Sequence, residues 1–425
     1  MRKPRYRSGS ESGAPHRPRL ATARPLAGAG LALLALTAVA CGGTPAASTS
    51  PAPTSSASAA TGNGTLPTAN PAVAASEGTA AGQQLGTAKA PKSRTVAYLR
   101  FIAADSSDQL DYKAFTAAAS AFGWKVIQCD GQGNPTVMLS CGRTLLADHP
   151  DAFVDDGIPP SLIGPVLQQA KAANIPTISF SGTLNPCAPY DACFTAPDGE
   201  MGTLLAQYVV KKMSSLPAGE QQMIVQKFPA DWGVARVNAI QPVFAGSKVK
   251  VVASPTADPT NLVPGTQQQV TSLTVQYPNT RAIWITFDGA VSGAAQAMSA
   301  KFAGKQFPNA PMVVTFYQEP ETLSLIQQGK VTATVYESLG WDAFVVVDQL
   351  AEHFARNKAF ATSPQPAYPG KNLEFWQPRI IDASNVGSGS YPASPVDYPA
   401  YFAAKWKAEF GLSDSSMATA LNPIP

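Results

Sequence analysis

The sequence predicts an α/β protein made of two doubly wound parallel-sheet lobes. Short β-branched or apolar runs alternate with segments of helical period, which is the pattern of parallel strands with crossover helices. This pattern occurs twice in succession beyond residue 93. The chain from there to residue 425 is also long enough for two domains with cores of their own.

The first set of predicted strands covers 95–102, 124–129, 151–156, 176–181 and 192–196. Helical periods lie between them, for example at 112–122, which ends at Gly123, and at 161–173. Strands spaced in this way suit βα units.

The second set of predicted strands covers 222–228, 248–254, 281–287, 311–317 and 331–338, with helices at 234–244, 267–277, 290–301 and 320–328. Beyond them we expect a long amphipathic helix at 341–356, a late strand at 373–381 and a terminal helix at 398–410.

The chain begins with a segment typical of export. The first 24 residues carry seven Lys or Arg and one Glu, and an uncharged run follows from Pro25 to Ala40. That run is short of the roughly 18 to 20 apolar residues that span a bilayer. The end of the run resembles a bacterial lipoprotein signal, with Cys41 as the lipidated residue, although Ala38 stands where Leu is usual. The alternative is an ordinary secretory signal with an incidental cysteine.

The leader also accounts for the basic net charge. The whole chain has a net charge of +3, and the first 40 residues contribute seven positive charges and one negative charge, which leaves the remainder near −3. The net charge is therefore no sign of nucleic-acid binding.

Residues 41–92 are rich in Ala, Ser, Thr, Pro and Gly and contain few large aliphatic or aromatic residues. Because such a segment has little apolar surface to bury, we expect a disordered tether over this whole range.

The remaining cysteines form an even set, namely Cys129, Cys141, Cys187 and Cys193. In an exported protein this predicts two disulfides. Three pairings are open, and we favour Cys129 with Cys141 and Cys187 with Cys193, since each pair closes a short loop of turn-forming residues. A zinc site is the alternative, but the sequence has only His16, His149 and His353 and no C-x-x-C motif.

Several stretches carry a resemblance to a known family. They are TVAYLRFIAADSSDQLDYKAFTAAASAFGWKVIQCDGQGNP, LLADHPDAFVDDGI, VLQQAKAANIPTISFSG, TAPDGEMGTLLAQYVVKKM and VVTFYQEPETLSLIQQGKVTATVYESLGWDAF. Their order over roughly 95–387 resembles the type I periplasmic binding proteins of sugar transporters, of the ribose-binding kind, which share their fold with lactose-repressor-type regulators.

The resemblance implies two lobes joined by three chain crossings, near 196–201, 337–342 and 357–371. Lobe 1 would then comprise 93–198 and 340–365, and lobe 2 would comprise 199–339 and 366–387. Residues 388–425 would form a C-terminal extension with a helix. In open α/β sheets, ligands bind outside the carboxyl ends of strands, and a hinge lets the lobes close on the ligand.

Polar or aromatic residues recur at the predicted strand ends. We expect ligand contacts from Asp105, Ser106, Asp156, Ser181, Trp232, Asp288, Tyr317 and Glu337, with Asp155 beside them. Carboxylates accept hydrogen bonds from vicinal hydroxyls, and an aromatic face covers the C–H surface of a sugar ring. The set suits a polyhydroxylated ligand.

Each of these positions has a structural alternative. Asp105 and Ser106 are also residues that cap helices, and the Asp288-Gly289 dipeptide also forms turns. Trp232 could pack inside its lobe. Glu337 takes the place of an amide that is usual in the family, which would make this end of the cleft acidic.

Three departures from the family pattern concern the ligand. Ser181-Gly182 and Tyr317-Gln318 stand where the sugar binders often carry Asp-Arg and Asp-Gly, and the family's arginine on the following helix falls near Arg236 or Asn238. The resemblance therefore does not imply a ribose-like pentose.

The expected function is that of a solute-binding protein, without cofactor or catalysis, which serves an ABC permease as a monomer on the outer face of the membrane through lipidated Cys41. A sensor that presents its closed form to a membrane receptor is the alternative, as is a non-sugar solute. A glycosidase-like pair of carboxylates in the cleft is a further alternative, but the sequence has no G-x-S-x-G or H-E-x-x-H motif. No nucleic acid is expected as a partner.

Overall fold

The computed structural model describes residues 70–370, 377–388 and 396–419. The predicted leader, Cys41 and the first part of the predicted tether, up to residue 69, lie outside the described residues. In the described part of the chain, no helix is both long enough and apolar enough to cross a membrane.

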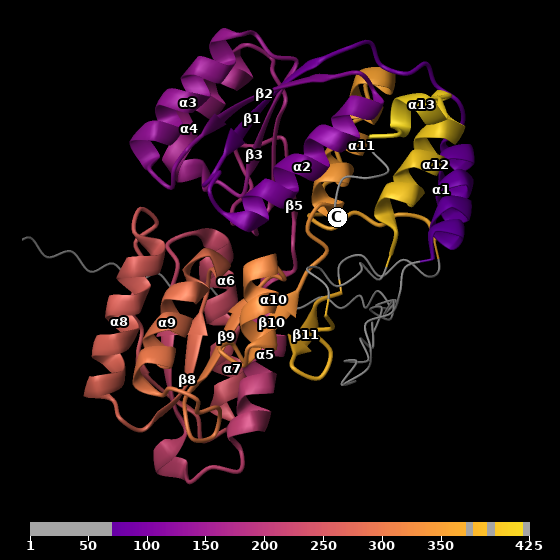
Figure 1. Cartoon of the computed structure of the whole chain (residues 1–425). Helices are drawn as coiled ribbons and strands as arrows, with labels where there is room; N and C mark the ends of the chain where they lie inside the picture. Colours follow the sequence, from indigo (N-terminus) through magenta and orange to yellow (C-terminus); the bar gives the residue numbers. More distant parts are fainter. Residues whose placement is uncertain (1–69, 371–376, 389–395, 420–425) are drawn as a thin grey trace, which may run out of the picture. The chain divides into compact units, whose positions relative to one another are not determined.

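The first lobe is built on a parallel sheet of five strands in the order β2-β1-β3-β4-β5 (Figure 1). The strands are β1 (Thr95–Arg100), β2 (Lys125–Asp130), β3 (Ala152–Asp156), β4 (Thr177–Ser181) and β5 (Ala192–Thr195). All five predicted strands of the first set are confirmed, with ends that differ by one or two residues.

Helices cover both faces of this sheet, and β1 shows how the sequence separates the two faces. Val96 and Tyr98 join the core under α2 (Ser106–Ala121) and α11 (Trp341–Arg356), whereas Ala97 and Leu99 join the core under α3 (Pro135–Ala147) and α4 (Pro160–Ala172). Successive side chains of a strand point to opposite faces, so a continuous apolar run buries both.

The second lobe has a sheet of six strands in the order β11-β10-β9-β8-β6-β7, in which only β11 is antiparallel to its neighbour. The strands are β6 (Gln222–Gln226), β7 (Lys250–Ala253), β8 (Thr280–Ile285), β9 (Met312–Phe316), β10 (Ala333–Tyr336) and β11 (Arg379–Asp382). The second predicted set is confirmed, and β11 begins near the end of the late strand predicted at 373–381, whose residues 373–376 lie outside the described part.

The helices of the second lobe are α5 (Asp198–Met213), α6 (Asp231–Asn238), α7 (Ile240–Ala245), α8 (Leu262–Gln276), α9 (Val291–Lys301) and α10 (Pro320–Gln327), with short 3₁₀ turns η1 (Ala218–Glu220) and η2 (Asp288–Ala290). The single helix predicted at 234–244 is wrong, because two helices meet at Ala239. Pro242 has no N–H to donate to the carbonyl of Asn238, which favours the break.

The chain passes between the lobes where the resemblance implied, after β5, between β10 and α11, and between α11 and β11. The first and third passages are joined, since Thr195 donates its N–H to the carbonyl of Pro364 (2.9 Å). A fourth passage, beyond the expected three, leads from β11 back to α12 (Tyr398–Phe410), whose side chains lie in the core of the first lobe.

Helix α1 (Pro71–Leu85) contradicts the predicted disorder of 41–92 over its own length. Asn70 caps it, and Pro71 occupies its first turn, where a missing N–H costs nothing. Its buried face consists of Ala and Gly, and a β-carbon on Gly78 would lie 2.0 Å from the carbonyl oxygen of Tyr401 in α12. The helix is held by close approach of two backbones rather than by large side chains (Figure 1).

Helix α12 has the bounds that the sequence predicts, and a short helix, α13 (Asp414–Met417), follows it. The aromatic side chains of α12 fill the space beside α11, and Trp406 stacks on Phe344 with 5.7 Å between ring centroids. Lys405 is buried between Asp348 (2.6 Å) and Glu409 (2.9 Å). The C-terminal extension is therefore part of the first lobe's core.

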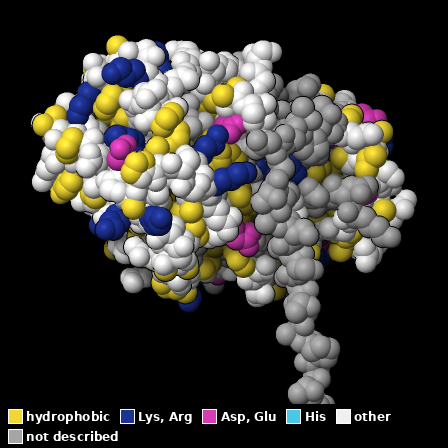
Figure 2. Space-filling model, turned by 90° about the horizontal axis from the view of Figure 1, so that it is seen from below, with side chains coloured by type: hydrophobic (Ala, Val, Ile, Leu, Met, Phe, Trp, Pro, Cys, Tyr) yellow, Lys and Arg dark blue, Asp and Glu magenta, His cyan; other side chains and the backbone are white. Residues whose placement is uncertain are grey.

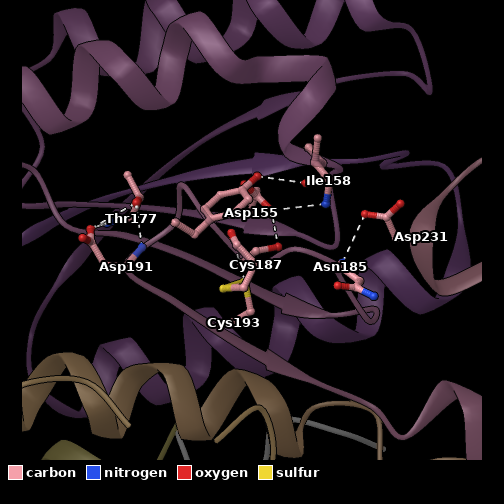
Figure 3. Close-up of a disulfide and its surroundings, with 10 residues drawn as sticks. Asp155, Ile158, Thr177, Asn185, Cys187, Asp191, Cys193 and Asp231 are labelled. Atoms are coloured by element: carbon pink, nitrogen blue, oxygen red, sulfur yellow. Dashed lines mark hydrogen bonds between the residues drawn. A yellow bond between two sulfur atoms is a disulfide. The ribbon is translucent and has the colours of Figure 1, made fainter. Parts of the chain in front are cut away.

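Both favoured disulfides are present, Cys129 with Cys141 and Cys187 with Cys193. The second closes the loop between β4 and β5, and Figure 3 shows it among the groups that fix this loop. There Asp191 accepts the N–H of Thr177 (2.7 Å), and the N–H of Asn185 points to Asp231 at the start of α6 (3.3 Å). The bridged loop thus reaches the second lobe.

Candidate functional site

A small pocket lies where strand ends of both lobes face each other. Its lining residues are Phe101, Ile102, Asp105, Ser107, Asp108, Asp156, Gly157, Ser181, Gly182, Trp232, Phe287 and Tyr317. The first nine follow β1, β3 and β4 of the first lobe, and the last three follow β6, β8 and β9 of the second. Every contributing strand supplies its carboxyl end, which is where open α/β sheets bind ligands.

Five of the predicted contact residues line this pocket, namely Asp105, Asp156, Ser181, Trp232 and Tyr317. They come from five different strand ends, so the structure brings together residues that are up to 212 positions apart in the sequence.

Three predicted contact residues do not line the pocket. Ser106 is the first residue of α2, and its neighbour Ser107 takes the place in the lining. Asp288 is buried in η2, and Glu337 is buried at the end of β10. Asp155, also considered, is fully buried and accepts hydrogen bonds from Ser179 (2.6 Å) and from the N–H of Ile158 (3.2 Å), so it organises the β3 end.

Two lining residues have an unusual backbone. Ser181 has φ of 75° and Tyr317 has φ of 63°, in the left-handed region that residues with a side chain seldom adopt. Ser181 is the last residue of β4 in the first lobe, and Tyr317 follows β9 in the second. Such strain persists only where the surroundings impose it, and it concentrates at ligand sites.

Arg236 holds the second-lobe side of the site together. Its fully buried guanidinium donates to Asp198 (2.6 Å), to the carbonyl of Thr286 (2.9 Å) and to the hydroxyl of Tyr317. Asp198 in turn accepts the N–H of Thr183, in the first lobe, at 2.8 Å. One cation therefore links the aromatic wall of the pocket to the chain crossing between the lobes.

An aromatic cluster forms this wall. Trp232 stacks on Phe228 with 4.6 Å between ring centroids and contacts Phe287 at 5.3 Å. Phe101 of the first lobe meets Phe228 edge-on at 6.0 Å. The indole of Trp232 also lies over the Arg236 guanidinium, which is 4.8 Å from its ring centroid. Trp232 thus both lines the pocket and packs inside its lobe.

Asp105 and Asp108 show how the first-lobe side is built. Asp105 caps α2, and its Oδ2 accepts from the N–H (3.2 Å) and the hydroxyl of Ser107. Asp108 accepts from Arg100 (2.5 Å) and from the N–H of Ile102 (3.1 Å). The capping role that the sequence suggested for Asp105 is thus present, and the same side chain lines the pocket.

Buried carboxyl groups outnumber cations around the pocket. The carboxyl groups are Asp105, Asp108, Asp111, Asp156, Asp198, Asp288, Glu319, Glu337 and Asp342, and the guanidinium groups that neighbour them are those of Arg100 and Arg236. Burial, and then the charge of Asp288, raises the pKa of Asp105, and burial raises the pKa of Asp288 to about 6.

Glu337 is also buried within this acidic region. Burial raises its pKa, as do the charges of Asp342 and Asp198, while Arg236 opposes them. Neither of its carboxyl oxygens has a hydrogen-bond partner within the described residues.

Several groups of the site were not predicted from the sequence, among them Ser107, Asp108, Gly182 and Phe287. Two carried a readable signal, since Asp108 lies three residues after the predicted contact Asp105, and Phe287 ends a predicted strand. Nothing in the sequence indicates Gly182 as a site residue, because its place in the pocket lining depends on how the lobes meet. Within the described ranges, no group of three or more His, Cys, Asp or Glu side chains is placed to hold a metal ion.

Two doubly wound lobes with a pocket between their strand ends define a two-lobed, hinged ligand-binding protein. The chain belongs to the family of periplasmic binding protein domains, whose model matches residues 74–358. The fold expected from the resemblance is confirmed.

Solved structures share the fold at low sequence identity. A galactofuranose-binding protein is 16% identical, with a TM-score of 0.59 over 69% of this chain and 96% of its own. An ABC transporter solute-binding protein from Agrobacterium vitis with bound allitol is 20% identical, with a TM-score of 0.60 over 69% and 97%. A Caulobacter myo-inositol-binding protein is 17% identical, with a TM-score of 0.58 over 69% and 94%. No curated protein matches the sequence.

Proposed function

We propose that this protein captures a small polyhydroxylated solute, a sugar or a polyol, between its lobes and delivers it to an ABC importer, without catalysing a reaction. The observation that carries the proposal is the pocket itself, in which carboxyl groups of the first lobe face aromatic side chains of the second. Carboxylates pair with hydroxyls, and aromatic rings cover C–H surface. The ligands of the three structural neighbours support the same class.

The ligand class is tested first by native mass spectrometry of the protein purified from its own cells, which identifies a copurified solute. A thermal-shift screen of sugars, polyols and amino acids follows. We expect a saturable rise in Tm with at least one sugar or polyol, because a ligand that binds only the folded state stabilises it. Peptides and apolar compounds are screened in the same way, and a rise with these compounds alone would contradict the proposal.

We also propose that the protein is held at the outer face of the cell membrane by a lipid on Cys41. The support is the sequence around that residue, namely a basic segment and an uncharged run followed by small residues and then cysteine. The test compares the wild-type chain with Cys41→Ala in detergent phase partitioning. The wild-type chain should enter the detergent phase, and equal partitioning of the two would refute the anchor.

Delivery to an importer is tested in cells. Deletion of the gene should abolish uptake of the radiolabelled solute, and a chain with both Asp156→Asn and Trp232→Ala should fail to restore it. Normal uptake in the deletion strain would favour a sensory role instead. A single, monomeric species in analytical ultracentrifugation is expected in both cases.

A further inference from the structure

Asp156 is one of the acidic groups that have no hydrogen-bond or ion-pair partner within the described part of the chain. Among these groups it is the most exposed to the pocket. It lines the pocket at the end of β3, and no described residue gives it a hydrogen bond or an ion pair. The other two lining carboxylates differ, because Asp108 is paired with Arg100 and Asp105 is bonded to Ser107.

A second carboxylate of the pocket lining, that of Asp105, also has an oxygen without a hydrogen-bond partner among the described residues. Asp105 is more than nine-tenths buried, and both hydrogen bonds that it accepts go to Oδ2. Its Oδ1 points across to the second lobe, since a β-carbon on Gly289 would lie 2.4 Å from it. That oxygen has no hydrogen-bond partner among the described residues.

The charges around Asp105 and Asp156 are predominantly negative. Asp105 faces Asp288 in η2 and Asp108 in α2, and Asp156 faces Asp108, Asp111, Asp105 and Asp155. The cations that lie closest are already engaged, Arg100 with Asp108 and Arg236 with Asp198. The carboxyl groups of Asp288 and Glu319 are also buried near Asp105 and interact with each other.

A neutral polyol would satisfy hydrogen bonds here but would leave the repulsion between the carboxylates unchanged. An ammonium group donates three hydrogen bonds and also carries the missing positive charge. In a buried site of low dielectric constant, the attraction between this positive charge and the carboxylates is large.

We propose that the ligand is a polyhydroxylated amine, an amino sugar or an amino polyol, whose ammonium group lies between Asp156 and Oδ1 of Asp105. This inference rests on the proposed function and narrows its ligand class. The hydroxyls of the ligand meet the remaining polar groups of the pocket, and its C–H surface meets the aromatic wall of the second lobe.

The test uses matched pairs of ligands that differ only in one amino group, namely galactose with galactosamine, glucose with glucosamine, and sorbitol with glucamine, measured by isothermal titration calorimetry at constant ionic strength. In at least one pair, the amine should bind about tenfold more tightly than its neutral partner. A gain in affinity of about tenfold is usual for a charge-assisted hydrogen bond. The advantage should grow from pH 5 to pH 7, because more of the carboxyl groups ionise while the amine stays charged.

Asp156→Asn is the sharpest variant, because Asp156 makes no internal hydrogen bond whose loss could unfold the protein. It should abolish the preference for the amine over its neutral partner, as expected when only a charge is removed. Asp148→Asn, an exposed acid after α3, is the matched control and should keep the preference.

The outcomes separate the two proposals. Equal or tighter binding of the neutral partners would overturn the amine and leave the sugar or polyol function standing. A preference for the amine that survives Asp156→Asn would overturn the placement of the ammonium group. If neither the amines nor their neutral partners bound, the result would count against the proposed function itself. An equal response to ammonium chloride alone would show a simple cation effect and refute the inference.

Discussion

The indole of Trp232 lies directly against the backbone of Gly182, so that a β-carbon added to Gly182 would be 2.4 Å from Cδ1 of the ring. Gly182 follows β4 of the first lobe, and Trp232 belongs to α6 of the second. The lobes therefore meet in this arrangement only because position 182 has no side chain. Real side chains do not approach so closely, and something would have to move.

Gly182→Ala should hinder this meeting of the lobes. The indole is packed between Phe228 and Arg236 and has little room to yield. We expect a larger radius of gyration in small-angle X-ray scattering and at least about tenfold weaker binding of any ligand held between the lobes, a cost of about 1.4 kcal/mol. Gly199→Ala, where the added carbon meets open space, is the control. Identical scattering curves for all three proteins would contradict the steric argument.

Arg236→Met should destabilise the protein strongly. The substitution leaves Asp198 buried without its cation, and breaking a buried pair from one side costs about 3 to 5 kcal/mol. Adding Asp198→Asn should recover part of this loss. Arg281→Met breaks a partly exposed pair with Glu220 and should cost at most about 1 kcal/mol. Urea unfolding measures all four proteins, and equal losses for the two arginines would be inconsistent with the buried role of Arg236.

Asp288 should make stability depend on pH. Its pKa is about 6 in the folded protein and 3.8 as the ordinary value, so the folded state binds this proton more tightly. The stabilisation is present below about pH 4 and is lost as the pH rises through 6. The groups that act on it are Glu319, Arg236 and Asp105.

Asp288→Asn removes this titration. The free energy of unfolding of the variant, relative to the wild-type chain, should rise by about 2 to 3 kcal/mol between pH 4 and pH 7.5. Urea unfolding at the two pH values measures the difference. The free energy of unfolding of Asp148→Asn should change with pH in the same way as that of the wild-type chain. A pH-independent difference for Asp288→Asn would mean that its carboxyl group is not held in its neutral form.

Gly78→Ala should detach α1 from α12, because the added carbon would lie 2.0 Å from the carbonyl oxygen of Tyr401. We expect faster amide exchange in α1 and a loss of about 1 to 3 kcal/mol, while the two sheets stay protected. Gly164→Ala, also in a helix but facing open space, should be neutral or stabilising. Unchanged protection of α1 would show that the helix accommodates the extra carbon.

The strands could be predicted from the sequence because an apolar run buried on both faces is distinctive. The errors have local causes. The buried face of helix α1 lacks the large apolar side chains by which a sequence indicates burial, and its Gly78 and Gly82 are instead buried through close contact with carbonyl groups of α12. The break between α6 and α7 depends on a single missing N–H, at Pro242.

The site could be predicted to the extent that it follows from strand ends. Asp105, Asp156, Ser181, Trp232 and Tyr317 lie where parallel strands end, and the structure brings them to one pocket. Whether Ser106 or Ser107 lines the pocket depends on which side of helix α2 faces it. The place of Gly182 depends on contact between lobes, about which spacing along the chain says nothing.

The surface contrasts with the acidic interior. On the face shown in Figure 2, Lys and Arg side chains are dispersed among uncharged ones, and Asp and Glu are sparse. Around the pocket, by contrast, several carboxyl groups are buried, where a negative charge is costly. A cationic ligand would offset that cost.

The docking of α1 on the first lobe has a mechanical consequence. Arg356, at the end of α11, donates to the carbonyl of Gly86 (2.6 Å) and to Glu409 (3.0 Å), so the segment after α1 is fastened at two helices. Any pull that arrives along the chain from before Pro71 is borne by the first lobe. Because α1 packs on α12 in the core of the first lobe, such a pull reaches the first lobe before it reaches the second.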